Sequence, residues 1–233
     1  MNRFDRWVLK VKRRETPAAR LAHDAYHRLL DLRLPETDNS RRVFRMAYVA
    51  HDILVDSREW AAGKLLYEPM LRGRAFTCGP GLRITALPYI RGHVRIRIGA
   101  NCTFGLFSVS SGRFIDKPQL IFGDGCTVGT DVLFNVNKRI MIGNHVGISG
   151  RVTIQDSDGH PSDPERRMRG EQITEADIGP VTIGDYAWIG RDAQVLKGVT
   201  IGKGAVVAAG SIVATDVPDG ALAMGCPARV VRR

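Results

Sequence analysis

Between residues 181 and 218, an aliphatic residue returns at every sixth position, and a small residue usually follows it. The aliphatic positions are Ile183, Ile189, Val195, Ile201, Val207 and Val213. This period fits neither an α-helix, which repeats about every 3.6 residues, nor a β-strand, which repeats at every second residue. It is typical of a parallel β-helix, in which each flat face uses one hexapeptide and the aliphatic side chains stack inside. The small residues leave room for the chain to turn at the corners; they are Gly184, Gly190, Gly202, Ala208 and Ala214.

The same pattern extends toward the N-terminus with two interruptions. Its apolar positions there are Ile98, Phe104, Phe122, Val128, Phe134, Ile142, Ile148 and Ile154. Ser110 and Asp116 break the pattern, but the separation of Phe104 from Phe122 equals three hexads, so we expect the coil count to continue with one irregular rung. The repeat then stops over residues 155–182. Because long loops inside a regular scaffold are usually functional, we predict that this excursion carries the function.

Apolar residues at helical spacing precede the repeats. Thr16 and Pro17 form a typical helix start, with a capping hydroxyl and a proline in the first turn, and Pro35 ends the segment. A second helix is expected from a cap at Asn39-Ser40 to about residue 62, with an apolar face formed by Val43, Met46, Ala50, Ile53 and Leu54. A short helical turn is expected over residues 64–71.

The chain therefore divides into a helical segment, residues 1–72, and a β-helix domain, residues 73–233. We expect residues 16–72 to bury their apolar faces on the N-terminal end of the β-helix, because short isolated helices are marginal in water. Residues 1–15 mix basic and apolar side chains and could make a weak contact with an anionic membrane. No stretch has the roughly 18 apolar residues of a membrane span or the apolar core of a signal peptide, so we expect a cytoplasmic protein.

The composition limits the partners. Among 233 residues there are 34 Lys and Arg against 24 Asp and Glu, a net charge of +10. The excess is spread along the chain and no run combines basic with aromatic residues, so a nucleic-acid-binding module is not expected, whereas a phosphorylated cofactor is compatible. Scattered cysteines predict reduced thiols and no metal or disulfide framework; they are Cys78, Cys102, Cys126 and Cys226.

His160, at the start of the excursion, is the leading candidate for chemistry. Alternate residues of an extended chain share a side, so Asp156, Asp158 and His160 would project together. An imidazole can remove a hydroxyl proton near neutral pH, and a carboxylate can orient the ring. On these residues alone, a solvated polar loop is an equally good interpretation. Asn135 and Asn137, one to two coils earlier, either contact a ligand or satisfy backbone groups at a corner.

The repeats, the His160 loop and the C-terminal segment 225–232 resemble the hexapeptide-repeat acyltransferases, in particular the maltose, galactoside, and capsule or lipopolysaccharide O-acetyltransferases. The resemblance covers about residues 95–232. It implies a mainly β fold, a left-handed parallel β-helix of hexapeptide repeats with an N-terminal α-helical segment. It also implies a homotrimer with active sites between subunits.

The resemblance assigns roles to the polar residues at the head of the excursion. It implies that His160 is the general base and that a carboxylate, Asp158 in preference to Asp156, orients its ring. A similar Asn-x-Asn precedes the catalytic loop in the sugar acetyltransferases, where its first Asn contacts the acceptor. By that match, Asn135 and Asn137 are candidate substrate-binding residues.

For coenzyme A, the resemblance implies a channel lined by the last coils and the tail. The matching positions are Trp188, Arg191, Ala209, Ala214, Thr215, Arg229 and Arg232. Guanidinium groups suit the phosphates of the coenzyme. The chain departs from the family pattern at two places. Ala214 and Thr215 stand where relatives often have Thr-Lys, so one phosphate-binding lysine is missing, and Arg191 replaces a residue that is usually small.

We therefore expect an O-acetyltransferase that uses acetyl-coenzyme A as cosubstrate and acts on a sugar or glycan hydroxyl by direct transfer, without a metal. The alternatives are N-acylation of an amino sugar, transfer of a longer acyl group, a non-catalytic β-helix scaffold, and a metal hydratase on the same fold. A three-histidine zinc site is not favoured: the coil region offers only His93, His145 and His160, and His93 precedes the regular repeats.

Overall fold

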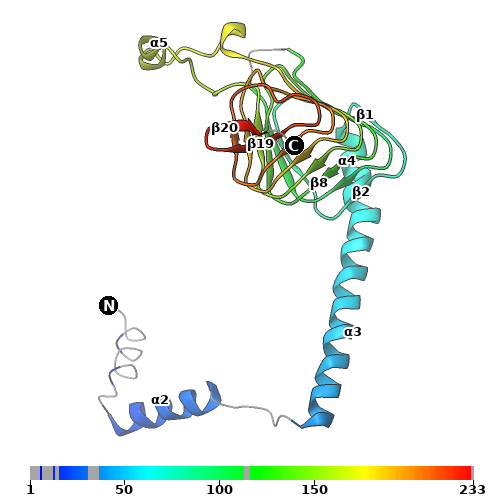
Figure 1. The fold of residues 1–233 in the computed structure, drawn as a ribbon. Helices are drawn as coiled ribbons and strands as arrows, with labels where there is room; N and C mark the ends of the chain where they lie inside the picture. The colour runs from blue at the N-terminus through cyan, green and yellow to red at the C-terminus, as the bar shows by residue number, and fades with distance from the viewer. Residues whose placement is uncertain (1–5, 7–12, 14–15, 31–36, 113–115, 232–233) are drawn as a thin grey trace. The chain divides into compact units, whose positions relative to one another are not determined.

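The structure is a computed structural model of the chain and describes residues 6, 13, 16–30, 37–112 and 116–231. The chain divides into two compact units, Met1–Leu54 and Val55–Arg233. The helices that precede the strands in the described part are α2 (Pro17–Leu30), α3 (Asp38–Ala62), a π-helical turn (Gly63–Tyr67) and α4 (Glu68–Arg74) (Figure 1). None of the helices in the described part is long and apolar enough to cross a lipid bilayer.

Both long helices begin close to the positions that the sequence predicts. At the start of α3, however, the cap lies two residues before the predicted Asn39. The backbone N–H of Ser40 donates to Thr37 Oγ1 at 3.1 Å, and the N–H of Thr37 donates to Ser40 Oγ at 2.9 Å. The two hydroxyl side chains therefore satisfy donors at the helix start reciprocally, as a capping box does.

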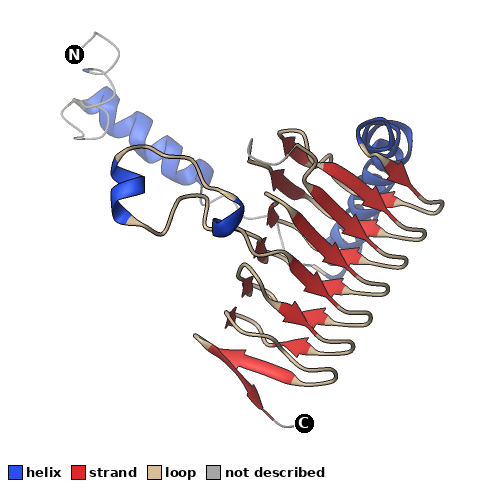
Figure 2. Cartoon of the chain, turned by 90° about the horizontal axis from the view of Figure 1, so that it is seen from above, coloured by secondary structure: helices blue, strands red, loops and turns tan. Residues whose placement is uncertain are grey.

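After α4 the chain winds into a parallel β-helix with three flat faces, drawn as stacked strands in Figure 2. Sheet A contains β1 (Thr77–Cys78), β4 (Arg95–Ile98), β7 (Gln119–Phe122), β10 (Arg139–Ile142), β13 (Val181–Ile183) and β16 (Thr200–Ile201). Sheet B contains β2 (Arg83–Ile84), β5 (Thr103–Phe104), β8 (Thr127–Val128), β11 (Gly147–Ile148), β14 (Trp188–Ile189), β17 (Val206–Val207), β19 (Leu222–Gly225) and β20 (Ala228–Val231). Sheet C contains β3 (Tyr89–Arg91), β6 (Phe107–Ser110), β9 (Val132–Asn135), β12 (Thr153–Gln155), β15 (Gln194–Val195) and β18 (Ile212–Val213).

The hexad positions form the core of this β-helix. On sheet A, the register stacks one buried aliphatic or aromatic side chain on the next through Ile98, Phe122, Ile142, Ile183 and Ile201. Each step is one strand spacing of about 4.8 Å, close enough for side-chain contact. The predicted parallel β-helix with an N-terminal helical segment is therefore confirmed.

The predicted rung between Phe104 and Phe122 was wrong in register. Phe104 lies in β5 of sheet B and pairs with Val128, whereas Phe122 lies in β7 of sheet A and pairs with Ile98. The reason is that Val109 of β6, the register partner of Phe134 on sheet C, follows Phe104 by only five positions, so Ser110 at the hexad position points outward. The additional residues follow β6, at the corner between sheets C and A.

The first coil is covered by the segment that precedes it. Leu71 of α4 is 1% exposed and belongs to the same core, and Glu68 is buried and paired with Lys64 and Arg72. In contrast, α3 has no buried residue. The expected packing on the β-helix therefore holds for the segment from Gly63 to Arg74, whereas the expected packing of residues 16–62 stays a prediction.

The excursion leaves sheet C after β12 and returns at β13. It contains a short helix, α5 (Pro164–Met168), and a 3₁₀ turn (Glu175–Asp177), and it projects from the coils (Figure 2). Ser157 and Ile178 form an antiparallel bridge at its base, and the N–H of Gly179 donates to the carbonyl of Asp156. Its two ends are therefore fixed to each other where they meet the β-helix.

Candidate active site

A cleft of about 310 Å³ lies at the corner where sheet C passes to sheet A, beside the head of the excursion. Its lining comes from three successive coils and the loop; the residues are Ser110, Ser111, Gly112, Asn135, Asn137, Gln155, Ser157, Asp158 and Gly159. Ser110, Asn135 and Gln155 are register partners on β6, β9 and β12, and their side chains point outward from the core. The fold thus brings Asn135, Asn137 and Asp158, which the sequence predicts as site residues, into one cleft.

Hydrogen bonds hold both asparagine side chains in place. The Ser110 hydroxyl donates to Asn135 Oδ1, and Asn137 Nδ2 donates to Ser157 Oγ at 2.6 Å. Asn137 is buried, whereas Asn135 is half-buried and open to the cleft. Asn135 is therefore the asparagine that can present an amide group to a ligand.

Asp156 lies beneath the cleft and supports its backbone. Its carboxylate is fully buried and accepts N–H groups from Asn137, Lys138 and Arg139 at 2.7–2.8 Å. Burial raises the pKa of the Asp156 carboxyl above its ordinary value, and the three backbone donors oppose that shift. Both carboxylate oxygens are thus engaged with backbone and do not contact His160.

Asp158 is paired with a lysine from a later coil. Lys197 Nζ lies 2.6 Å from Asp158 Oδ2 and 3.4 Å from the carbonyl oxygen of Asp177, to which it donates a hydrogen bond. The His160 side chain is exposed, and within the described part of the chain it forms no hydrogen bond or ion pair. The structure therefore places His160 next to the cleft-lining Gly159, but it does not bring either aspartate into contact with the imidazole.

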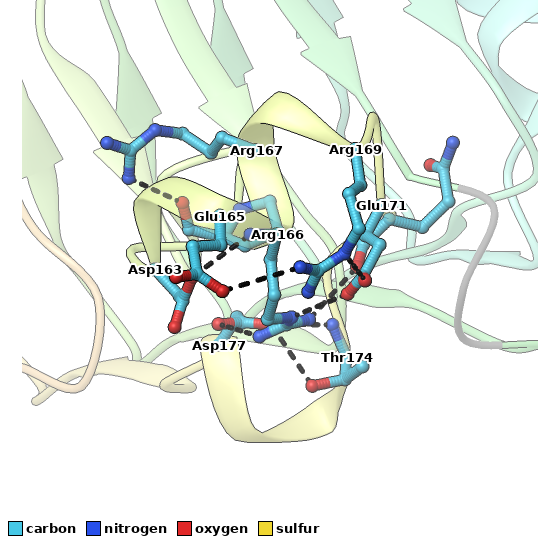
Figure 3. Close-up of polar contacts among 10 residues, drawn as sticks. Asp163, Glu165, Arg166, Arg167, Arg169, Glu171, Thr174 and Asp177 are labelled. Atoms are coloured by element: carbon cyan, nitrogen blue, oxygen red, sulfur yellow. Dashed lines mark hydrogen bonds and ion pairs between the residues drawn. The ribbon is translucent and has the colours of Figure 1, made fainter.

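A cluster of charged side chains, which we call the Arg166 latch, stabilises the excursion (Figure 3). The Arg166 guanidinium donates to both carboxylate oxygens of Asp177 at 3.1 and 3.3 Å and to Glu171 Oε2 at 3.0 Å. The backbone N–H of Thr174, together with Arg166, lowers the pKa of the Asp177 carboxyl below its ordinary value. Asp177 is therefore ionised at neutral pH and ties α5 to the 3₁₀ turn, Glu175–Asp177.

Arg167 holds the segment that immediately follows His160. Its Nη1 donates to the carbonyl oxygens of Pro161 and Ser162 at 2.9 and 2.5 Å. The sequence reasoning missed Arg166, Arg167 and Lys197. A signal for the arginines was present, since an excursion rich in Arg, Asp and Glu can form internal ion pairs. Nothing in the hexad pattern distinguishes Lys197.

The residues predicted to bind coenzyme A occupy the last coils. Trp188 is exposed and donates from Nε1 to Ser149 Oγ at 3.3 Å, and the carbonyl of Arg191 accepts the N–H of Gly210, which stacks Arg191 beside Ala209 at the corner after sheet B. Ala214 and Thr215 follow β18 at the corner after sheet C. In the terminal hairpin, Arg229 pairs with Met224. Arg232 lies outside the described residues.

The family described as "Bacterial transferase hexapeptide (six repeats)" matches residues 180–215. Nodulation protein L of Rhizobium meliloti (strain 1021) is 42% identical over 133 residues, which cover 54% of this chain and 70% of that protein. This identity, over more than two thirds of that protein, shows which family the chain belongs to. The chain belongs to the hexapeptide-repeat acetyltransferase family.

Two further comparisons concern one relative in sequence and one similar structure. A galactoside O-acetyltransferase of Escherichia coli (strain K12) is 35% identical over 132 residues, but the chain spans only 63% of the length of that relative. AntD, an N-acyltransferase from Bacillus cereus, has a similar structure with a TM-score of 0.56 at 17% identity, and the similarity covers 71% of this chain and 87% of AntD. At that identity, the likeness to AntD concerns the fold alone.

Proposed function

We propose that the protein transfers an acetyl group from acetyl-coenzyme A to a hydroxyl of a sugar or glycan, with His160 as the general base. The observation that carries this proposal is the polar cleft at the head of the excursion, in a chain of the hexapeptide-repeat acetyltransferase family. Hydroxyl and amide groups line the cleft, and such groups bind sugar hydroxyls by hydrogen bonds.

In this proposal the acceptor hydroxyl lies between Asn135 and His160. The imidazole takes the hydroxyl proton as the oxygen attacks the thioester carbonyl, and the thiolate of coenzyme A leaves and is protonated. Arg167 holds the adjoining backbone, and the exposed His160 ring has no hydrogen bond or ion pair among the described residues, so it can turn toward such a substrate. Asn135 positions the acceptor, and Asp158 stays a candidate for orienting the ring.

The acyl donor is proposed from the family and from the tail. The E. coli relative is a galactoside O-acetyltransferase, and AntD, which shares the fold, was crystallised with coenzyme A. Arg191 and Arg229 are exposed on the last coils and can pair with phosphates. In a single chain the proposed coenzyme positions are spread over two corners and a hairpin, which supports a homotrimer in which adjacent subunits complete each site.

The first prediction tests His160 directly. Purified protein is supplied with acetyl-coenzyme A and a panel of sugars, and release of the free thiol is followed. His160→Ala should lower turnover by about 10²–10⁴-fold, the usual contribution of a general base, while the affinity for coenzyme A stays unchanged. Lability of the product to mild base distinguishes an O-acetyl ester from an N-acetyl amide.

The matched control is His145→Asn. His145 stacks on Tyr186 with ring centroids 5.2 Å apart, at a backbone φ of +56° that asparagine tolerates. This variant should keep full turnover. Near-normal turnover of folded His160→Ala would remove His160 from the mechanism, and an alkali-stable product on an amino sugar would replace O-transfer by N-transfer.

A further inference from the structure

The outward-facing residues Gln155, Asn135 and Ser110 form a column along sheet C, and one coil further this column continues to an arginine. Arg91 of β3 is the register partner of Ser110, which in turn pairs with Asn135 on β9. Arg91 is exposed, and it alternates with the more buried Ile90 as an outward-facing residue does. Successive strands are about 4.8 Å apart, so the backbone at Arg91 lies roughly 10 Å from that at Asn135, along the axis of the β-helix.

The Arg91 guanidinium is held in position but is not neutralised. Its Nε donates to Tyr89 Oη at 2.6 Å, and its Cζ lies 5.1 Å from the centroid of the Tyr89 ring. These contacts use only one of the five N–H donors of the guanidinium. No carboxylate pairs with Arg91 in the described part of the chain, so its two terminal amino groups can bind an anion in a forked geometry.

Two more arginines border the same corner on sheet A. Arg95 and Arg139 are the first residues of β4 and β10, and both are register partners of Gln119 on the strand between them. Arg95 lies over the Phe76 ring with its Cζ 5.1 Å from the centroid, and the Arg139 N–H donates to the Asp156 carboxylate beneath the cleft. Neither guanidinium has an ion pair among the described residues. The described border of the cleft thus carries guanidinium groups that form no ion pair.

The cleft itself carries little charge. Among the lining residues that the structure describes, the one ionisable side chain, Asp158, is paired with Lys197. A ligand that satisfies both parts of this surface therefore presents hydroxyl groups to the cleft and an acidic group to the arginines. We propose that the acceptor is an acidic saccharide whose carboxylate or phosphate binds Arg91, with Arg95 and Arg139 as flanking cations. That this saccharide accepts the acetyl group rests on the proposed function, whereas the preference for binding an acidic saccharide does not.

The arginine site is separate from the proposed coenzyme positions. Arg91 lies on β3, at one end of sheet C, and Ala214 and Thr215 follow β18, at the other end. Five strand spacings separate these strands, roughly 24 Å. The Arg91 charge is therefore not needed to explain how the phosphates of a coenzyme would be held within the same chain.

The test measures binding without an acyl donor, by calorimetry at low ionic strength. One matched pair is trigalacturonate and its carboxyl-reduced counterpart, which keeps the same sugars and linkages without the charges. A second pair, galactose 6-phosphate and galactose, distinguishes phosphate from carboxylate. We expect the acidic member of at least one pair to bind roughly fivefold more tightly than the neutral one, and the difference to shrink as salt is added.

Substitutions locate that preference. Arg91→Gln should remove most of the difference between acidic and neutral ligands and leave the binding of the neutral ligand unchanged. Arg83→Gln, which removes an equal charge from the exposed surface of β2 on sheet B, should leave the difference intact. Equal affinity for the acidic and neutral members of both pairs overturns the proposal, as does an equally large effect of Arg83→Gln. Absence of thiol release with every sugar would contradict the proposed function while leaving this calorimetric result in place.

Discussion

Asp156 and Asp158 are two positions apart, yet their surroundings give them different roles. Asp156 is buried and accepts three backbone N–H groups, whereas Asp158 is exposed and pairs with Lys197. The alternation of an extended chain predicts that the two carboxylates project together with His160. The antiparallel bridge at Ser157 and the bend after it change those directions. The sequence therefore indicated that these polar residues lie together at the head of the excursion, but not which of their side chains are in contact.

A double-mutant cycle can decide what Asp158 does. If its main partner is Lys197, which also binds the Asp177 carbonyl, then Asp158→Asn and Lys197→Met disturb the same contact at the base of the excursion. Because the pair is partly exposed, each substitution should lower kcat/KM by roughly two- to fivefold, and the double variant should be no worse than either single one.

The pH dependence of kcat distinguishes this role of Asp158 from a role in orienting His160. A role of Asp158 in orienting His160 would appear as a shift in the acidic limb of the kcat profile with Asp158→Asn and not with Lys197→Met. Additive losses in the double variant would likewise show that the two side chains act independently.

At the scale of elements, the hexad pattern predicted the strands well because their inward side chains must be apolar. Ile183, Ile189 and Val195, one on each sheet, are all buried. The pattern failed at β6, where Val109 takes the inward position that the hexad assigns to Ser110. The same break brings Ser110 to the cleft, so the interruption of the hexad pattern coincides with a cleft-lining residue.

The Arg166 latch stabilises the conformation of the excursion. The sequence did not predict it, because only the folded loop brings Arg166 close to its partners. Arg166→Met should raise backbone amide exchange across residues 160–177 by roughly fivefold or more, because it removes the charged hydrogen bonds that join α5 to Asp177. Turnover should fall with it, because the His160 segment loses its fixed position. Hydrogen exchange read by mass spectrometry measures the effect.

Arg169→Met is the matched control for this prediction. Arg169 pairs with Glu165 and Glu171 but is exposed, and it makes no contact with Asp177, so exchange should stay near that of the unsubstituted protein. The pH dependence has a defined sign. The pKa of Asp177 is lowered in the folded state, so its stabilisation is present at neutral pH and is lost as pH falls from about 4 through the lowered value. In strong acid, the excursions of the two variants should become equally mobile, and a difference that persists there would contradict the ionic account.

At the scale of the whole molecule, exposed apolar side chains predict association. In the described part of α3 they include Val43, Phe44, Met46, Tyr48, Val49, Ile53, Leu54 and Trp60. Such a concentration on one helix usually marks an interaction surface. We predict that these residues contribute to the contacts of a homotrimer, and light scattering should give three times the mass of one chain. A monomer at micromolar concentration would contradict the trimer and, with it, sites completed by adjacent subunits.

Two truncations separate association from folding. Removal of residues 1–54 leaves the unit from Val55 onward, which contains the β-helix and the segment that covers its first coil. This truncated protein should keep a cooperative thermal transition while losing the part of the trimer contact that α3 provides. Circular dichroism and light scattering report the two properties separately.

Removal of residues 1–72 should have a different result, because it also removes Leu71, which is 1% exposed within the core. It removes the guanidinium of Arg72 as well, which donates to the carbonyl oxygens of Cys78 and Gly79 at 3.1 and 3.0 Å. Leu82 and Ile84, buried in the full chain, would then face water and promote aggregation. A monodisperse protein that lacks residues 1–72 and retains the transition temperature of the shorter truncation would show that the first coil needs no such cover.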